Sequence, residues 1–161
     1  AYFSPATKPE ELIALAWYLE DGSRKFYSGV AASLSENEAR DLYMQLAKAE
    51  EHHKASLLKL YKEFPGGVPE TEFPESVLPR GEEGDVMEGG MRVSEALEWA
   101  KGKKMTEILE LSLSIEANAY DLYLKMERQM KDERSAQVFQ LLSGEEKHHL
   151  EQLGSFLEKR V

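Results

Sequence analysis

The stretch LAKAEEHHKASL at residues 46–57 has a diverged second copy, LSGEEKHHLEQL, at residues 142–153. The same offset of 96 residues continues upstream without a gap, where Glu20 aligns with Glu116. Identical pairs at this offset include Leu15 and Leu111, Glu20 and Glu116, Tyr27 and Tyr123, Leu46 and Leu142, Glu50 and Glu146, His52 and His148, His53 and His149, and Leu57 and Leu153. Because most of these pairs are polar, the repeat indicates a shared chemical role in addition to shared packing.

Apolar residues recur at helical spacing through most of the chain, and the alternation typical of strands is absent. The spacing predicts long helices at about residues 10–34, 35–64, 105–130 and 133–159, and a short helix at residues 93–100. Ser35 followed by Glu38 has the pattern of a capping box, which predicts the start of the second helix. The predicted fold class is therefore all-α, an up-down four-helix bundle.

The repeat also predicts the domain organisation. We expect one domain over residues 1–161, made of a first hairpin at 8–64, a crossover with a short helix at 65–104, and a second hairpin at 105–161. Hairpins related by a pseudo-two-fold axis require the chain to cross the full bundle length between them. Residues 65–91, rich in proline, glycine and acidic residues, are expected to be this connection rather than a core element. Whether residues 87–91 cover the site or form a subunit contact is left open.

The repeated glutamates are expected to lie at one level of the bundle. In the first hairpin, Glu20 and Glu50 each lie 15 residues from Ser35 at the turn, and the second hairpin repeats this arrangement around Lys131. In an antiparallel pair, equal distance from the turn means equal height along the axis. A histidine three residues after the second glutamate shares its helix face. The predicted site has six inward-facing side chains: Glu20, Glu50, His53, Glu116, Glu146 and His149.

These six side chains predict a two-metal site. Burying four carboxylates without compensation would cost several kcal/mol each. Two divalent cations neutralise four glutamates, with the two imidazoles uncharged. One glutamate from each of two helices, plus Glu-x-x-His from each of the other two, is a di-iron or di-manganese ligand set. We expect two iron ions, with manganese or a mixed pair also compatible with the ligands. The alternative, surface charges on duplicated hairpins, does not explain their place on the apolar helix faces.

Glu51 and Glu145 offer rival pairings with the histidines, but the repeat argues against both. A pairing of Glu145 with His148 would require a glutamate in place of Ala49. The counterpart of Glu51 is Lys147, which cannot replace a metal ligand. The repeat therefore favours the frame of six residues given above.

Two other repeated pairs lie near the predicted site. His52 and His148 are expected to point away from it, as exposed helix residues. Tyr27 and Tyr123 each follow a predicted ligand by seven residues, or two helical turns. They are ordinary core tyrosines, or they donate hydrogen bonds to ligating carboxylates, or they lend an electron during peroxide chemistry.

Composition excludes several other kinds of protein. The chain has no cysteine, which excludes disulfides and thiolate metal sites and fits a reducing compartment, so we expect a cytoplasmic location. The net charge of −10 argues against a nucleic-acid partner. No apolar run is long enough to span a membrane, and no signal peptide is evident at the N-terminus.

The two motifs resemble those of the rubrerythrin family of ferritin-like proteins. The resemblance rests on LAxxExxH at 46–53, LSxxExxH at 142–149, and the upstream Glu20 with Phe26-Tyr27 and Glu116 with Leu122-Tyr123. It implies a ferritin-like bundle in which Glu50 and Glu146 bridge two irons. Glu20 with His53 would complete one iron site, and Glu116 with His149 the other.

The sequence departs from the family pattern in ways that bear on partners. Rubrerythrins proper end in a four-cysteine rubredoxin module, so a chain without cysteine implies a separate electron donor. Many also carry a glutamate at the position of Ala119, which implies a simpler, symmetric site here.

A homodimer is expected. The connector resembles that of ferritin-like domains fused after a rhodanese-type sulfurtransferase, which would account for the absence of an initiator methionine.

The resemblance implies a redox function. The first hypothesis is an oxidoreductase that reduces hydrogen peroxide or activates dioxygen, with electrons from a separate donor. The second is an iron-handling ferroxidase that feeds storage or transfer. The third is a non-enzymatic bundle, stabilised by metal and used for interactions. The sequence leaves the choice between the first two open.

Overall fold

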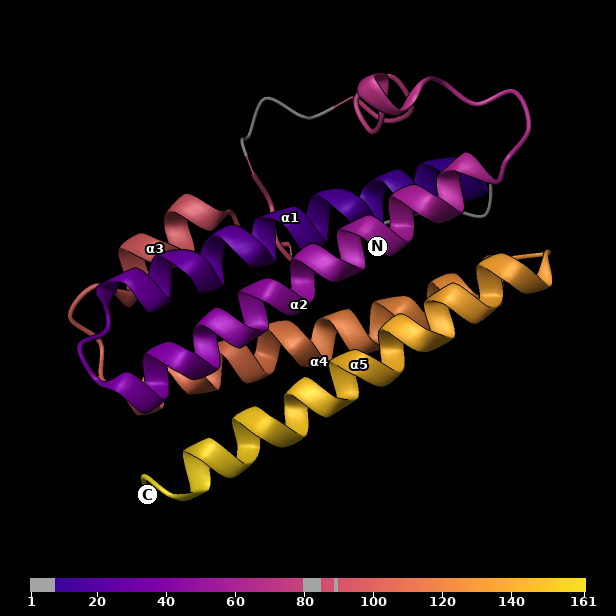
Figure 1. Ribbon diagram of the computed structural model, residues 1–161. Helices are drawn as coiled ribbons and strands as arrows, with labels where there is room; N and C mark the ends of the chain where they lie inside the picture. Colours follow the sequence, from indigo (N-terminus) through magenta and orange to yellow (C-terminus); the bar gives the residue numbers. More distant parts are fainter. Residues whose placement is uncertain (1–7, 80–84, 89) are drawn as a thin grey trace.

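The computed structural model describes residues 8–79, 85–88 and 90–161 (Figure 1). These residues form four long helices, one short helix and a single 3-10 turn, with one isolated antiparallel bridge between Val86 and Arg92. In chain order, the elements are α1 (Pro9–Ser33), α2 (Asn37–Lys62), η1 (Glu70–Glu72), α3 (Val93–Ala100), α4 (Met105–Gln129) and α5 (Glu133–Glu158). The predicted all-α fold is confirmed.

The observed helix ends agree with the predicted ends to within about two residues, and local chemistry explains several of them. Pro9 is the first residue of α1, where its missing N–H costs nothing. Asp132 caps α5, because its side chain accepts a 2.8 Å hydrogen bond from the backbone N–H of Ser135. The predicted capping box at Ser35 is wrong. The cap residue of α2 is Glu36, whose carboxylate instead pairs with Arg160.

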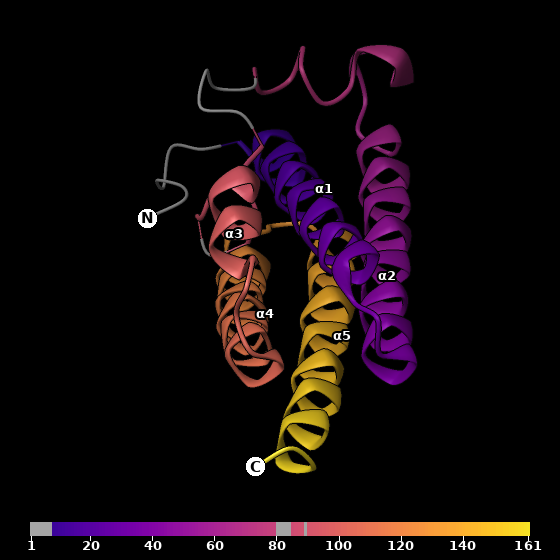
Figure 2. The same cartoon turned by 90° about the vertical axis from the view of Figure 1, so that its left-hand side faces the viewer.

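The four long helices form two hairpins that pack on each other. In Figure 1, α1 lies beside α2 in the upper part of the bundle, and α4 lies beside α5 in the lower part. The hairpins meet where α2 runs along α5. The short helix α3 covers α1 from outside in both Figure 1 and Figure 2.

The buried apolar residues form two clusters rather than one continuous core. The first contains Leu12 and Leu19 of α1, together with Leu142 of α5. The second contains Phe26 of α1 and Leu153 of α5. On each long helix, the predicted metal ligands stand between the residues of one cluster and those of the other. A polar layer therefore divides the core.

The connector contributes to the core, which corrects the prediction that it is only a connection. Phe73 is 9% exposed, and its ring lies 4.6 Å from that of Tyr61. Met87 is fully buried in the second apolar cluster. Of residues 87–91, Gly89 lies outside the described residues. Met87 and Glu88 are both fully buried, and the backbone N–H of Glu88 donates to Ser23 Oγ of α1.

In the part of the chain that the structure describes, no helix combines the length and apolar character needed to cross a bilayer.

Candidate metal centre

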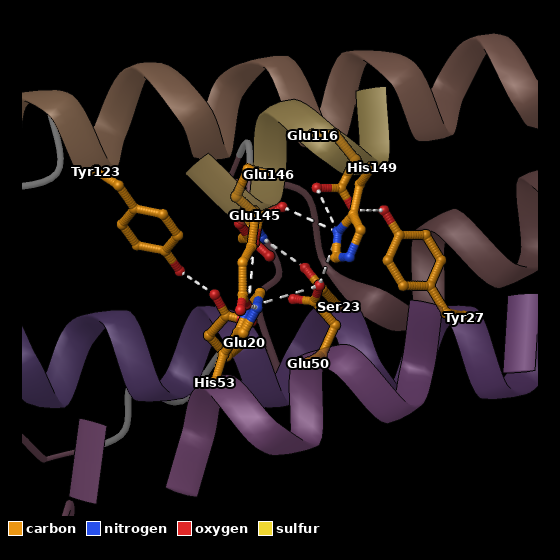
Figure 3. A network of polar contacts seen from close by, with 11 residues as sticks. Glu20, Ser23, Tyr27, Glu50, His53, Glu116, Tyr123, Glu145, Glu146 and His149 are labelled. Atoms are coloured by element: carbon orange, nitrogen blue, oxygen red, sulfur yellow. Dashed lines mark hydrogen bonds and ion pairs between the residues drawn. The ribbon is translucent and has the colours of Figure 1, made fainter. Parts of the chain in front are cut away.

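All six predicted ligands lie together in the polar layer. Each is at most 5% exposed. Their donor atoms form two groups, each with all atoms within 4.8 Å of one another. The groups are Glu20, Glu50, His53 and Glu146, and Glu50, Glu116, Glu146 and His149. Glu50 and Glu146 belong to both groups, as expected for residues that bridge two ions. Figure 3 shows all six side chains converging from four helices.

In the first group, His53 faces the carboxylates through one ring nitrogen. His53 Nδ1 lies 3.2 Å from Glu20 Oε2 and 3.2 Å from Glu146 Oε1. Its distance to Glu50 Oε1 is 4.0 Å. The same nitrogen therefore faces one carboxylate from each of three helices.

The second group repeats this arrangement around His149. His149 Nδ1 lies 3.5 Å from Glu116 Oε2 and 3.5 Å from Glu146 Oε2. Its distance to Glu50 Oε1 is 3.7 Å. The two imidazole rings are stacked, with centroids 5.9 Å apart. The two groups thus lie next to each other across the pseudo-two-fold axis.

Several buried oxygens of this site lack hydrogen-bond partners among the described residues. Both carboxyl oxygens of Glu50 and of Glu146 are unpartnered, as are Glu116 Oε2 and His149 Nδ1. A buried polar atom without a partner costs about 1–3 kcal/mol, and a charged one more. A bound cation would satisfy all of them at once. Mixed oxygen and nitrogen donors suit iron or manganese, so the residues present fit a pair of such ions.

The electrostatics of the cluster also reflect excess negative charge. Burial, and then the charge of Glu146, raises the pKa of Glu50 well above its ordinary value. Burial acts in the same direction on Glu146, but its contacts with His149 and His53 outweigh burial and lower its pKa. Burial opposes charge on His53, but the surrounding carboxylates, Glu20 first, raise its pKa. Protons thus offset the carboxylate charge where no metal is bound, and metal binding must release them.

Both tyrosines are hydrogen-bond donors to predicted ligands, and electron donation by them stays a prediction. Tyr27 Oη donates a 2.6 Å hydrogen bond to Glu116 Oε1. Tyr123 Oη donates a short hydrogen bond to Glu20 Oε1. Each tyrosine therefore reaches across to a glutamate of the other hairpin. Both hydroxyls are fully buried, and burial, followed by the nearby carboxylate charges, raises the pKa of each well above its ordinary value.

The histidines excluded from the site lie where they were expected. His52 and His148 are exposed, on the helix faces opposite His53 and His149. Their exposure supports the frame in which Glu50 and Glu146 are the inward glutamates.

Glu145 contacts the site although the repeat argued against a role for it. Its carboxylate makes a short contact with His53 Nε2, the ring nitrogen that points away from the cluster. Metal-binding histidines usually donate their second N–H to such a carboxylate, which orients the ring and increases its basicity. The contact with His53 lowers the pKa of Glu145. Sequence reasoning missed this residue because its counterpart, Ala49, carries no carboxylate.

Glu88 of the connector is a fifth buried carboxylate of the same layer. It is fully buried, and neither of its carboxyl oxygens has a partner within the described residues. Burial, and then the charges of Glu146 and Glu20, raises its pKa well above the ordinary value. Sequence reasoning missed Glu88 because the connector has no counterpart in the repeat. The available signal was Gly22 on α1, where a Cβ atom would collide with the backbone of Val86 and Met87.

Comparisons with known proteins bear on the family of the second hairpin and on the fold. The model of the rubrerythrin family matches residues 107–161, which cover most of α4 and all of α5. No curated protein matches the chain significantly.

Two solved structures share the fold. A hypothetical protein from Pyrococcus furiosus is 24% identical, with 94% of this chain and 89% of that chain covered and a TM-score of 0.69. A candidate ferritin-like diiron-carboxylate protein from Thermotoga maritima is 18% identical, with 96% and 97% covered and a TM-score of 0.73. The resemblance predicted from the sequence is thus confirmed: the second hairpin matches the rubrerythrin family, and the chain as a whole has the fold of a ferritin-like helical bundle.

Proposed function

We propose that this protein is a di-iron redox protein of the rubrerythrin type, which reduces hydrogen peroxide or activates dioxygen. The observation that carries the proposal is the pair of donor groups that share Glu50 and Glu146. Shared carboxylates hold two ions close together, so that both can act on one small molecule. A bound iron pair would supply two-electron redox chemistry toward such an oxidant.

The protein residues would hold this centre in place and control access to it. Glu20 with His53, and Glu116 with His149, would each complete the ligands of one ion. Tyr27 and Tyr123 donate to the glutamates that are not shared, which orients each carboxylate and offsets part of its charge. Because every ligand is at most 5% exposed, only a small substrate would reach the centre.

The same proposal includes partners. Without cysteine, the chain cannot carry a rubredoxin-type iron site, so a separate donor would supply electrons. We also propose that the protein forms a homodimer and that it works in a reducing compartment such as the cytoplasm. Size-exclusion chromatography with light scattering tests the dimer.

Elemental analysis of the freshly purified protein, followed by anaerobic addition of peroxide to its reduced form, tests the proposed function. We expect iron in the protein, and rapid oxidation by about one equivalent of peroxide per metal pair, seen in the optical spectrum. A cage-like assembly that accumulates iron would indicate the ferroxidase alternative. Metal that raises Tm while peroxide leaves the spectrum of the reduced protein unchanged would indicate the structural alternative.

A further inference from the structure

The connector segment at residues 85–93, called the strap below, closes on itself over the polar layer. Its two ends are joined by the Val86–Arg92 bridge and by a 2.9 Å hydrogen bond from Val93 N to Asp85 O. Within it, Met87 N donates to Met91 O at 2.9 Å. The described residues of the strap, 85–88 and 90–93, are therefore joined by backbone hydrogen bonds, and Met87 and Glu88 lie between the joined ends.

The strap is held against α1 at the level of the site. The backbone N–H of Glu88 donates a 3.3 Å hydrogen bond to Ser23 Oγ. Lys25 Nζ lies 2.6 Å from Asp85 Oδ2. Gly22 allows this approach, because a Cβ atom there would lie 2.7 Å from Val86 C and 2.9 Å from Met87 Cα. Ser23, which anchors the strap, appears beside the ligands in Figure 3.

Burial at this position is energetically unfavourable for an ionised Glu88 side chain. It is fully buried, it feels the charges of Glu146 and Glu20 from outside the two donor groups, and neither of its oxygens has a hydrogen-bond partner among the described residues. A lone structural carboxyl would need a hydrogen-bond partner at such a position, and the site offers mainly further acceptors. A cation is the partner that would stabilise Glu88 and the other carboxylates together.

We propose that Glu88 is a fifth carboxylate of the metal centre, delivered by the strap as a further ligand. This inference rests on the proposed metal site and adds a residue to it. Four glutamates balance two divalent ions, so a fifth carboxylate leaves one negative charge in excess. That excess favours a metal pair of higher total charge. Glu88 would therefore strengthen metal binding and stabilise the oxidised pair.

The test is a Mn²⁺ titration of the metal-free protein, followed by the EPR signal of free Mn²⁺, for wild type and Glu88→Gln. Glutamine keeps the shape of the side chain and removes its charge. We expect affinity to fall by about 10- to 100-fold at one or both sites. In the iron-loaded protein, the midpoint potential should move to a more positive value. Tm of the metal-free variant should be unchanged or higher, because glutamine is neutral without binding a proton.

Gly22→Ala tests the delivery of Glu88 by the strap. The added Cβ would collide with the backbone of Val86 and displace the strap, so metal affinity should fall although Glu88 is present. Gly154→Ala is the matched control, because a Cβ at this helical glycine meets no atom within 4 Å. It should leave affinity unchanged. Far-UV circular dichroism establishes whether each variant folds. If Glu88→Gln does not fold, the metal affinity of Gly22→Ala tests the inference instead.

The outcomes separate the two proposals. If wild type takes up two Mn²⁺ per chain and Glu88→Gln does so with equal affinity and equal potential, Glu88 is a protonated structural carboxyl and the inference is wrong. If wild type binds no metal, the proposed function itself is wrong.

Discussion

The two halves of the metal centre have the same inner residues but different surroundings. In the first half, the Glu145 carboxylate contacts His53 Nε2, on the side of the ring that faces away from the other ligands. In the second half, the residue equivalent to Glu145 is Ala49, which can offer His149 no such contact. The carboxylate of Glu145 therefore belongs to the Glu20 and His53 half alone.

A second difference lies in the aromatic residues around the tyrosines. Tyr27, which donates to Glu116, lies against Tyr43, with ring centroids 5.7 Å apart. Tyr43 Oη is 2.7 Å from Ser112 Oγ. Tyr123, which donates to Glu20, lies against Phe139 instead, with centroids 6.0 Å apart. The duplication thus retained the ligands while their supporting residues diverged, and the two metal positions are expected to differ in affinity.

The largest effect is expected from the residues shared by both halves. Glu50→Ala or Glu146→Ala should reduce binding at both positions, because each residue belongs to both donor groups. Glu20→Ala and Glu116→Ala should each affect one position only. Anaerobic Fe²⁺ titration with analysis of bound metal measures this. Loss of a single ion from Glu50→Ala would contradict the bridging assignment.

The role of Glu145 can be tested by removing its carboxylate and by adding one to the other half. Glu145→Gln should weaken the His53 position by about 10- to 100-fold, as is usual for a residue that orients a ligand. Ala49→Glu should strengthen the His149 position and make the two affinities more alike. The measurement is two-site Mn²⁺ binding. Exposed Glu151→Gln is the control and should change neither affinity. Equal loss at both positions in Glu145→Gln would show that the two halves do not act separately.

The stability of the metal-free protein should fall as pH rises. The folded state raises the pKa of Glu50 and Glu88 above the ordinary 4.5, and that of His53 above 6.5. Stability from such protons is complete below the unfolded-state pKa values and is lost as pH rises through the folded-state values. Glu146, with a lowered pKa, acts oppositely but below pH 4.5. Tm should therefore fall as pH rises above 6.5. Metal-loaded protein should show the reverse trend, because binding releases protons.

The tyrosines should contribute a smaller, local effect. Tyr27→Phe and Tyr123→Phe each remove one buried donor to a glutamate, at a cost of about 1.5–3 kcal/mol in the metal-free protein if that glutamate is charged. Tyr43→Phe, which removes a hydrogen bond between neutral groups, should cost about 1 kcal/mol. Denaturant unfolding gives these values. If Tyr43→Phe costs as much as Tyr27→Phe, the charge of Glu116 does not strengthen its hydrogen bond.

Substitution of the exposed histidines should have the smallest effect. His52→Gln and His148→Gln should leave metal content unchanged, because both side chains lie on the solvent face of their helices. Elemental analysis of the two variants measures this. A large loss of metal from either would mean that the wrong histidines have been chosen as ligands.

The sequence predicted the helices and the six clustered residues well because both follow from periodicity and from internal repetition. Positions such as Glu50 and His53 could be identified because a second copy, Glu146 and His149, recurs at the same offset. Their role as ligands stays a prediction until metal is measured.

The same reasoning could not find residues that break the symmetry. Glu145 was set aside because Ala49 lacks its carboxylate, although a supporting residue need not be duplicated. Glu88 stands in a glycine-rich acidic segment, where one more glutamate is indistinguishable by pattern from a solvated charge. Its burial depends on the tertiary contact with Gly22, and a helix-interior glycine has several possible explanations.

The polar layer that divides the core has a consequence for how the metal-free chain moves. Each long helix is anchored by apolar packing at both ends and crosses a band of mutually repelling groups in its middle. Local opening should therefore begin at the centre of the helices rather than by fraying from their ends. Amide hydrogen exchange in the metal-free protein would then be fastest near Glu50 and Glu146 and slower in the apolar segments on either side. Bound metal would link the four helices at this central polar layer, and the amide exchange rates would become more uniform along each helix.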